Sequence, residues 1–221
     1  MRHLVLIRHG ESAWNRERRV QGQAGTGLSD LGLEQAELVA NWVAATCPDA
    51  TLVSSDLQRC RETVAPIAHR LGVSVTYDEQ LRERRFGRWE GRLLTEIQVD
   101  DAAVWERWRQ GEDVVGELGG ETGEELAARA STAFRRHLDA VEENGTVVLV
   151  THGGPIWHGL TALLRLHHGV LGGVGNTAVS QVGVEGERCW LEVWNQTSHL
   201  PAELRTSFRP SGTRDAPAVG R

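Results

Sequence analysis

The chain has 221 residues and a formal net charge of −6, and it contains no lysine, so all 24 of its basic side chains are arginine. The absence of lysine excludes Schiff-base chemistry and a P-loop lysine, and the acidic balance argues against a nucleic-acid partner. No apolar run approaches the roughly 20 residues that a membrane span needs, and the amino terminus lacks the pattern of a secretory signal. Three widely separated cysteines predict reduced thiols. We therefore expect a cytoplasmic protein with no membrane partner.

Strand-like and helix-like segments alternate along the chain, beginning with an apolar strand over 3–8. Further strands are predicted at 51–55, 73–78, 146–151 and, as two strands joined at Glu185-Gly186, within 176–195. Helices are predicted at 28–48, 56–72, 119–143 and 155–166, with shorter helical pieces up to about 111. This alternation predicts an α/β fold of three layers, with a mostly parallel central sheet and helices on both faces.

Several of these helices carry start and stop signals. Ser29 or Asp30 is a candidate N-cap for the helix over 28–48, and the helix over 119–143 has a capping-box-like start. Gly72 ends the helix over 56–72. Pro66 lies within that helix and predicts a kink or a break there.

The chain shows no shift in composition and no long linker before residue 200. We therefore predict a single domain over 1–200, in which the weakly periodic segment 80–120 is an insertion over the active site. The segment 201–221 is rich in proline, glycine and serine at its end and predicts a loose tail.

Two predicted strands end in polar turns that contain glycine, Arg8-His9-Gly10 and His152-Gly153-Gly154. Ligands of open α/β sheets bind beyond the carboxyl ends of the strands. If these two strands are neighbours, two imidazoles and one guanidinium converge, and Arg59 at the start of the next helix leans towards the same place. Arginine matches phosphate oxygens in bidentate fashion, and a helix N-terminus adds N–H donors. The sequence thus predicts a site for a tetrahedral dianion.

Four motifs in this order and spacing carry a resemblance to a known family: "LIRHGES" followed by Asn15, "SSDLQRCRET", "LRERRFGRWEG" and "VTHGG". Together they resemble the histidine phosphatase superfamily, whose members are phosphoglycerate mutase-like. The resemblance extends from about residue 3 to 195, which is nearly the whole chain. It implies a phosphomonoester hydrolase of the phosphoglycerate mutase-like fold, acting on a small-molecule phosphate ester.

The resemblance also implies roles for individual residues. His9 is the expected nucleophile, which becomes phosphohistidine, and Glu83 is the expected general acid and then base. The expected phosphate-binding residues are Arg8, Asn15, Gln21, Gly22, Arg59, His152 and Gly153. No metal and no other cofactor are implied, and a homodimer is the expected assembly.

Each of these residues alone has a structural explanation. Arg59 could be a solvated helix residue, and Glu83 lies among arginines, where a surface ion-pair cluster is the usual reading. Glu90 is a competitor for the acid role, although its place after Trp89 indicates a structural one. A protein that binds phosphorylated ligands without turnover would have lost one of the main catalytic residues, and all of them are present. The set as a whole therefore favours an enzyme.

Within the family the alternatives are hydrolysis and phosphoglycerate mutase activity. "RHGESAWN" is similar to the mutase form of the motif, whereas the acidic 95–120 segment, the loop "RVQGQAGTGLSDLG" and Gly154 favour the phosphatase. A mutase must hold a bisphosphorylated intermediate and exclude water, and the sequence offers little for a second cationic pocket.

The substrate class has weaker indications. "LGGVGNTAVSQV" and "WLEVWNQTSH" are similar to the C-terminal part of an actinobacterial subgroup that includes glucosyl-3-phosphoglycerate phosphatases, which implies a sugar or glycerate phosphate. Arginines of the 82–88 segment are candidates to meet a second anionic group of the substrate: Arg82, Arg84, Arg85 and Arg88. Tryptophans are candidates to line its pocket: Trp14, Trp89, Trp105 and Trp108.

Overall fold

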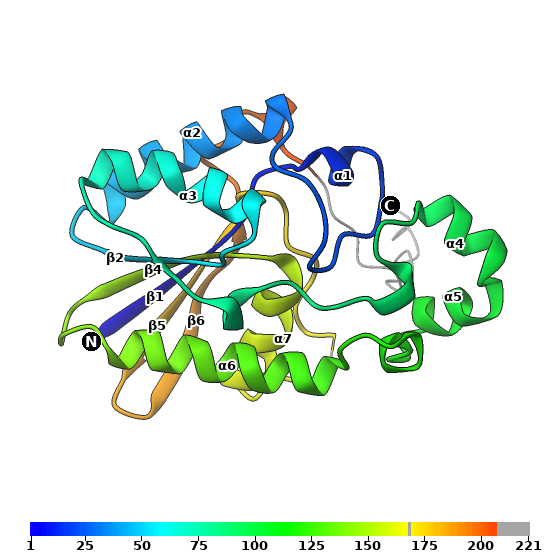
Figure 1. The fold of residues 1–221 in the computed structure, drawn as a ribbon. Coiled ribbons are helices and arrows are strands. Elements are labelled where there is room, and N and C mark those ends of the chain that lie inside the picture. The colour runs from blue at the N-terminus through cyan, green and yellow to red at the C-terminus, as the bar shows by residue number, and fades with distance from the viewer. Residues whose placement is uncertain (168, 207–221) are drawn as a thin grey trace, which may run out of the picture.

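The computed structural model describes residues 1–167 and 169–206, and a sheet of six strands lies at its centre (Figure 1). The strands lie in the order β3-β2-β4-β1-β5-β6. Their bounds are β1 Arg2–Arg8, β2 Thr51–Ser54, β3 Thr76–Tyr77, β4 Thr146–Thr151, β5 Val179–Glu185 and β6 Arg188–Gln196.

The sheet is mostly parallel, as predicted, because β1 to β4 run in one direction and only β5 and β6 are antiparallel to their neighbours. In the register between β1 and β4, Arg8 lies opposite Thr151. The residues that follow these two strands therefore meet at one edge of the sheet. β3 is much shorter than the predicted 73–78 strand, because it pairs only with the end of β2 and both of its residues are exposed.

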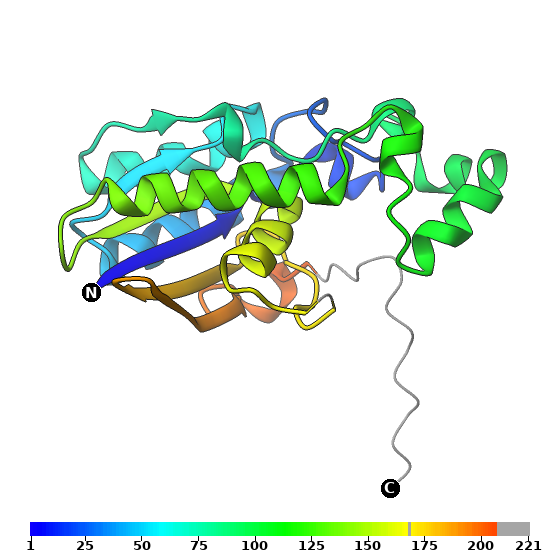
Figure 2. The same ribbon diagram turned by 90° about the horizontal axis from the view of Figure 1, so that it is seen from below.

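Four long helices cover the two faces of the sheet (Figures 1 and 2). Alternate residues of β1 point to opposite faces, so Leu6 belongs to the core that packs against α6 and α7, whereas Ile7 belongs to the core against α2 and α3. The three predicted layers are thus confirmed. The bounds of these helices are α2 Asp30–Thr46, α3 Gln58–Leu71, α6 Gly123–Asp139 and α7 Gly153–Leu163.

α3 continues through Pro66 without the predicted break, and Gly72 ends it in the left-handed conformation. Val64 and Ile67, on either side of the proline, are both fully buried in the core with α2. Because this burial holds both halves of the helix against the sheet, it outweighs the one hydrogen bond that proline removes.

The 80–120 segment contains short helices and a small core of its own. Trp89 is fully buried there with Ile97 and Val114, and Trp105 and Trp108 pack against it. Trp89 is therefore too buried to line a pocket, and the prediction is wrong for this residue, whereas for Trp14, Trp105 and Trp108, which are half-buried, it stays a prediction. The short helices of the chain are α1 Ala13–Arg16, α4 Leu94–Asp100 and α5 Ala102–Arg109, with 3₁₀ turns at Glu79–Leu81, Gly87–Trp89, Val115–Leu118 and Ala202–Leu204.

The first residues of the segment predicted to be a loose tail are bonded to the rest of the protein. Gln35 Nε2 donates to the Leu204 carbonyl at 2.8 Å, and Thr206 Oγ1 donates to Asn176 Oδ1 at 2.8 Å. The remainder of the predicted tail, 207–221, lies outside the described residues. Among the helices that the structure does describe, none combines the length and the apolar character needed to cross a membrane.

Candidate active site

The ends of β1 and β4 bring together the residues that the sequence singled out. The rings of His9 and His152 are edge to face, with their centroids 5.1 Å apart, and both side chains are buried. Arg59, in the first turn of α3, reaches the same place and donates from Nε to His152 Nδ1 at 3.1 Å. The expected convergence of two imidazoles with arginine is therefore present at the carboxyl edge of the sheet.

His9 is held in a form suited to nucleophilic attack. Its Nδ1 lies 2.7 Å from the Gly10 carbonyl, and because a carbonyl only accepts, Nδ1 must carry the proton. Nε2 therefore has a free lone pair when the ring is neutral. Burial, together with the charges of Arg59 and Arg8, holds the pKa of His9 well below 6.5. The imidazole is thus neutral at physiological pH.

Arg59 is fixed by three acceptors. Besides its bond to His152, Nη2 donates to the Gly22 carbonyl at 2.7 Å and Nη1 donates to the Ala24 carbonyl at 3.0 Å. Gly22 has a φ of +58°, and a Cβ there would overlap with Glu90 Oε1. Gly22 thus acts here through its carbonyl, which orients Arg59.

Arg8 is the second buried guanidinium of the site. Its Nη1 donates to the Val174 carbonyl at 2.6 Å. Burial lowers the pKa of Arg8 to about 10, an effect that nearby Glu83 partly offsets, so Arg8 stays protonated at neutral pH. A Cβ on Gly153 would lie 3.7 Å from Arg8 Nε, which places the Gly153 backbone beside this charge.

His152 has protein partners on both ring nitrogens. Its Nδ1 accepts from Arg59, so in the neutral ring Nε2 carries the proton, 2.9 Å from Ser55 Oγ and 3.4 Å from Cys60 Sγ. Burial and the charge of Arg59 hold the pKa of His152 well below 6.5. The ring therefore orients Arg59 in this structure, and its direct contact with phosphate stays a prediction.

Asn15 and Gln21 lie in the loop that follows β1. Asn15 Oδ1 accepts from the Ser12 backbone N–H at 3.2 Å and from Asn176 Nδ2 at 3.4 Å. Its amino group has no hydrogen bond among the described residues, which leaves two donors for a ligand. Gln21 Oε1 accepts from Ser12 Oγ at 2.8 Å. The amide of Asn15 is therefore oriented by its oxygen, and contact of its nitrogen with phosphate stays a prediction.

Glu83 reaches the site from the segment after the first 3₁₀ turn. Its Oε2 accepts from the Gly154 backbone N–H at 3.3 Å, and its Oε1 accepts from the Arg84 backbone N–H at 2.8 Å. The carboxyl group therefore lies at the first turn of α7, beside Gly154. A Cβ on Gly154 would overlap with Glu83 Oε1, so only glycine leaves room for this position of the carboxyl group.

Three of the four arginines of the 82–88 segment are paired within the protein, and contact of the fourth, Arg85, with a second anionic group of the substrate stays a prediction. Arg82 Nε donates to Asp56 at 2.7 Å, Arg84 binds Asp113, and Arg88 Nη1 donates to Asp101 at 2.8 Å. Arg85 is exposed and makes no ion pair among the described residues.

Glu90, the competitor for the acid role, has a structural position. Its Oε1 accepts from the backbone N–H groups of Gln23 at 3.2 Å and Phe86 at 2.9 Å. The bond to Gln23 joins the loop after β1 to the 80–120 segment, and the bond to Phe86 holds that segment in its own turn. Both support the structural reading of Glu90.

Several buried polar residues of the site had no role assigned from the sequence. Asn176 Nδ2 donates to the His9 carbonyl at 3.0 Å, and Thr63 Oγ1 accepts from the Gly10 backbone N–H at 3.0 Å. Ser55 and Cys60 contact His152, and burial raises the pKa of Cys60 to about 12, so its thiol stays neutral. Ser55, Cys60 and Thr63 lie inside "SSDLQRCRET" and Asn176 lies inside "LGGVGNTAVSQV", but the contact of Asn176 with His9 becomes recognisable only once β5 is placed beside β1.

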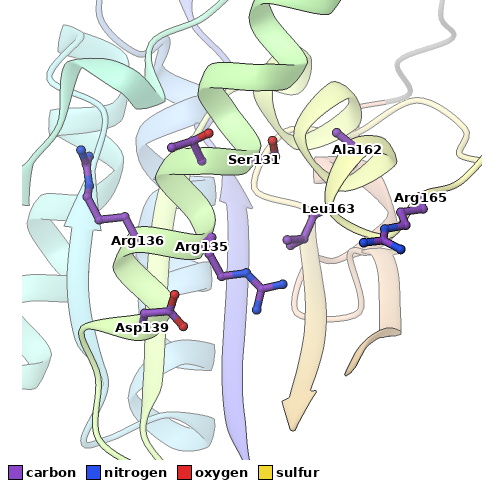
Figure 3. Close-up of a pocket in the computed structure, with 8 residues that line it drawn as sticks. Ser131, Arg135, Arg136, Asp139, Ala162, Leu163 and Arg165 are labelled. Carbon is purple, nitrogen blue, oxygen red and sulfur yellow. The ribbon is translucent and has the colours of Figure 1, made fainter. Parts of the chain in front are cut away.

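A separate cavity of about 480 Å³ lies between α6 and the end of α7 (Figure 3). Arg135, Asp139 and Arg165 are among its lining residues, and it includes none of the predicted site residues. Across 1–167 and 169–206, no group of three or more histidine, cysteine, aspartate or glutamate side chains is arranged to hold a metal ion.

Comparisons with known proteins point to one family. The family model "Histidine phosphatase superfamily (branch 1)" matches residues 4–197. A glucosyl-3-phosphoglycerate phosphatase of Mycobacterium tuberculosis is 35% identical over 222 residues, covering 92% of this chain and 98% of that protein. Phosphoglycerate mutase-like protein 4 of Arabidopsis thaliana is 34% identical over 214 residues, which cover 95% of this chain and 90% of that protein.

A solved structure is similar as well. The mycobacterial glucosyl-3-phosphoglycerate phosphatase in complex with VO3 has a TM-score of 0.81 and 35% identity, and the match covers 89% of this chain and all of that one. The family model and the two relatives each match nearly the whole chain. The chain belongs to branch 1 of the histidine phosphatase superfamily.

Proposed function

We propose that this protein hydrolyses small organic phosphomonoesters through a phosphohistidine at His9, without a metal ion. One observation carries the proposal: a neutral His9 with Nδ1 protonated and Nε2 free, beside the buried cations Arg8 and Arg59. A neutral imidazole is a good nucleophile towards phosphorus, and preoriented cations stabilise the charge of the phosphoryl group in transfer.

In the first step, His9 Nε2 attacks phosphorus and the bond from phosphorus to the ester oxygen breaks. The leaving oxygen takes the proton of the Glu83 carboxyl group and departs as the free alcohol. The phosphorylated ring keeps its Nδ1 proton on the Gly10 carbonyl, which stabilises the positive charge that forms on the imidazole. Arg8, Arg59 and the free amino group of Asn15 hold the phosphoryl oxygens.

In the second step, a water oxygen attacks phosphorus and gives its proton to the Glu83 carboxylate. The bond between phosphorus and Nε2 breaks, inorganic phosphate leaves, and His9 regains its lone pair. Glu83 again carries the proton that the next ester needs. The same carboxyl group thus serves as acid and then as base, and the cycle closes without any further reagent.

Hydrolysis is favoured over mutase activity by the charges of the 95–120 segment. Arg107 donates to Glu112 at 2.8 Å and to Glu117 at 3.0 Å, and Arg109 pairs with Glu106 at 3.3 Å. These cations are neutralised by their neighbours, so they offer no second pocket for the other phosphate of a bisphosphorylated intermediate.

For the substrate we propose a sugar or glycerate phosphate. The support is the 35% identity, over nearly the full length of both chains, to a protein named glucosyl-3-phosphoglycerate phosphatase. A panel of phosphate esters tests this proposal, and we expect acidic sugar phosphates to have the highest kcat/KM. Equal kcat/KM values for neutral and acidic esters would contradict it.

The reaction type is tested by phosphate release from an aryl phosphate in the presence of EDTA. We expect turnover by the wild type and its loss, by a factor of about 10³ or more, in His9→Ala. Loss of wild-type turnover on adding EDTA would contradict metal independence. Turnover that persisted in a correctly folded His9→Ala variant would contradict the role of His9.

A further inference from the structure

We infer that Arg129 of α6 is a positioning residue for Glu83, acting on the main chain of the segment that carries the acid. The inference rests on the proposed function of Glu83. Arg129 lies in the second turn of α6, and only 17% of its side chain is exposed. Among the described residues, it makes no recorded hydrogen bond to either histidine, to Arg8 or to Arg59. Its charge is the smallest of the causes that lower the pKa of His152, so Arg129→Lys, which keeps that charge, separates positioning of Glu83 from electrostatics.

All five N–H groups of the Arg129 guanidinium have acceptors. Nη1 donates to the carbonyls of Gln80 at 2.7 Å and Arg82 at 2.9 Å, and Nη2 donates to the carbonyl of Glu83 at 3.2 Å. The remaining two bonds, at 2.6 and 2.8 Å, go to the two carboxylate oxygens of Glu121. Glu121 is buried, so this bidentate pair fixes the plane of the guanidinium.

Other donors complete the restraint on the same segment. The Leu81 carbonyl accepts from Thr151 Oγ1 at 2.7 Å, and Gln23 Nε2 adds a second donor, at 3.2 Å, to the Glu83 carbonyl. Every carbonyl from residue 80 to residue 83 is therefore held by a tertiary hydrogen bond, and Arg129 supplies three of them. Thr151 directly precedes His152. Its bond therefore fixes the segment 80–83 to the end of β4, the same strand end that carries His152.

This arrangement has a consequence for the reaction. Among the described residues, the Glu83 carboxyl group is joined to α7 only by the bond from the Gly154 N–H, which at 3.3 Å is too long to fix it alone. Its distance to the leaving oxygen therefore depends on where the main chain of 82–83 lies. Loss of the Arg129 bonds should impair protonation of the leaving group and leave binding of the phosphoryl group to Arg8 and Arg59 intact.

The test compares two esters whose leaving groups need different amounts of protonation. An alkyl phosphate needs the acid, whereas a nitrophenyl phosphate leaves readily without it. In Arg129→Gln and Arg129→Lys we expect kcat/KM for the alkyl ester to fall about tenfold or more, a part of what general acid catalysis contributes. For the nitrophenyl ester we expect a change of less than about threefold. Because kcat/KM covers only the steps up to formation of phosphohistidine, the later step in which Glu83 activates water does not affect the measured value.

Two further variants make the result interpretable. Arg135 lies on the same helix (Figure 3), but its Nη2 donates to Cys189 Sγ of β6 at 3.2 Å. For Arg135→Gln we expect the ratio of kcat/KM between the two esters to equal that of the wild type. Glu83→Gln should lose activity on the alkyl ester more than on the nitrophenyl ester. Arg129→Lys keeps the charge and the alkyl stem, so it serves if Arg129→Gln fails to fold.

The outcomes separate this inference from the proposed function. If the Arg129 variants lost activity on both esters by the same factor, or on neither, while Glu83→Gln discriminated between them, the inference about Arg129 would be overturned and Glu83 would remain the acid. If Glu83→Gln itself showed no discrimination, the role of Glu83 would fail, and the inference with it.

Discussion

At the scale of single residues, the chemistry follows from which nitrogen carries the proton. The Gly10 carbonyl decides this for His9, because a carbonyl only accepts hydrogen bonds. Arg59 decides it for His152, because a guanidinium only donates them. The two histidines therefore hold opposite tautomers within 5.1 Å of each other. His9 is left with a free Nε2, whereas both ring nitrogens of His152 have protein partners.

The charge state of His9 is the first prediction at this scale. Burial, Arg59 and Arg8 all lower its pKa, so the ring of the free enzyme should stay neutral as the pH falls through 6.5. NMR titration of the ring nitrogens of His9, with no phosphate present, measures this directly. A midpoint at or above 6.5 would show that the two arginines and the burial do not act on His9 as described.

Gly154 gives a second prediction. A Cβ there would overlap with Glu83 Oε1, so Gly154→Ala must displace the carboxyl group. We expect kcat to fall on the order of tenfold, since small displacements of a catalytic group are costly. Gly153→Ala is the matched comparison, because its Cβ would meet Arg8 only at ordinary contact distances, and its loss should be smaller. Equal losses in both variants would contradict this explanation.

The sequence predicted the residues of the site better than their contacts. Strand ends and motifs placed Arg8, His9, Arg59 and His152 together, because parallel strands end at the same edge of a sheet. They did not predict that Arg59 donates a hydrogen bond to His152, nor that Asn176 donates one to the His9 carbonyl. These contacts depend on how segments far apart in sequence approach one another, and no local pattern records that.

At the scale of elements, α6 shows how local signals and tertiary contacts combine. Its capping box was expected from the sequence and is present, since Thr122 Oγ1 accepts from the Glu125 backbone N–H at 3.2 Å. The break expected at Pro66 and the full strand over 73–78 are absent, because burial sustains α3 and exposure shortens β3. The sequence thus predicted correctly where α6 begins, whereas burial decided how far α3 and β3 continue.

The cap of α6 gives the third prediction. Thr122→Ala removes the acceptor for the Glu125 N–H, and we expect the free energy of unfolding to fall by about 1 kcal/mol. Thr122→Ser keeps the hydroxyl group and should retain most of the stability. Urea denaturation of the three proteins checks this, and a Thr122→Ser variant as unstable as Thr122→Ala would show that the methyl group, not the cap, matters.

At the scale of the whole molecule, histidines that folding keeps neutral couple stability to pH. Burial, with a smaller contribution from Arg205, lowers the pKa of His199 from 6.5 to about 4, and its buried Nδ1 has no partner among the described residues. His9 and His152 are shifted in the same direction. As the pH falls below 6.5, the unfolded chain binds these protons first, so the native state loses stability.

The fourth prediction follows from this sign. The free energy of unfolding should decrease as the pH is lowered from 6.5 towards 4, and His199→Gln should make the decrease shallower. Urea midpoints measured across this range provide the comparison. Parallel curves for the wild type and His199→Gln would mean that the proton of His199 is not linked to folding.

The order of the strands was only partly predictable. Alternating strands and helices predicted a mostly parallel sheet, but that β1 and β4 are neighbours was only a condition for the predicted convergence of the two glycine turns. The antiparallel pairing of β5 with β1 brings Asn176 to the site, and the start of the predicted tail supports it through Thr206. These long-range pairings depend on the packing of the complete chain.

The central claim is that the phosphoryl group passes through His9, and trapping the phosphoenzyme tests it most directly. The enzyme is mixed with an aryl phosphate, quenched in alkali, which preserves phosphohistidine, and digested for mass spectrometry. We predict one phosphoryl group on His9 in the wild type and none in His9→Ala. A phosphoryl group on another residue, or turnover by an enzyme that never carries one, would contradict the account.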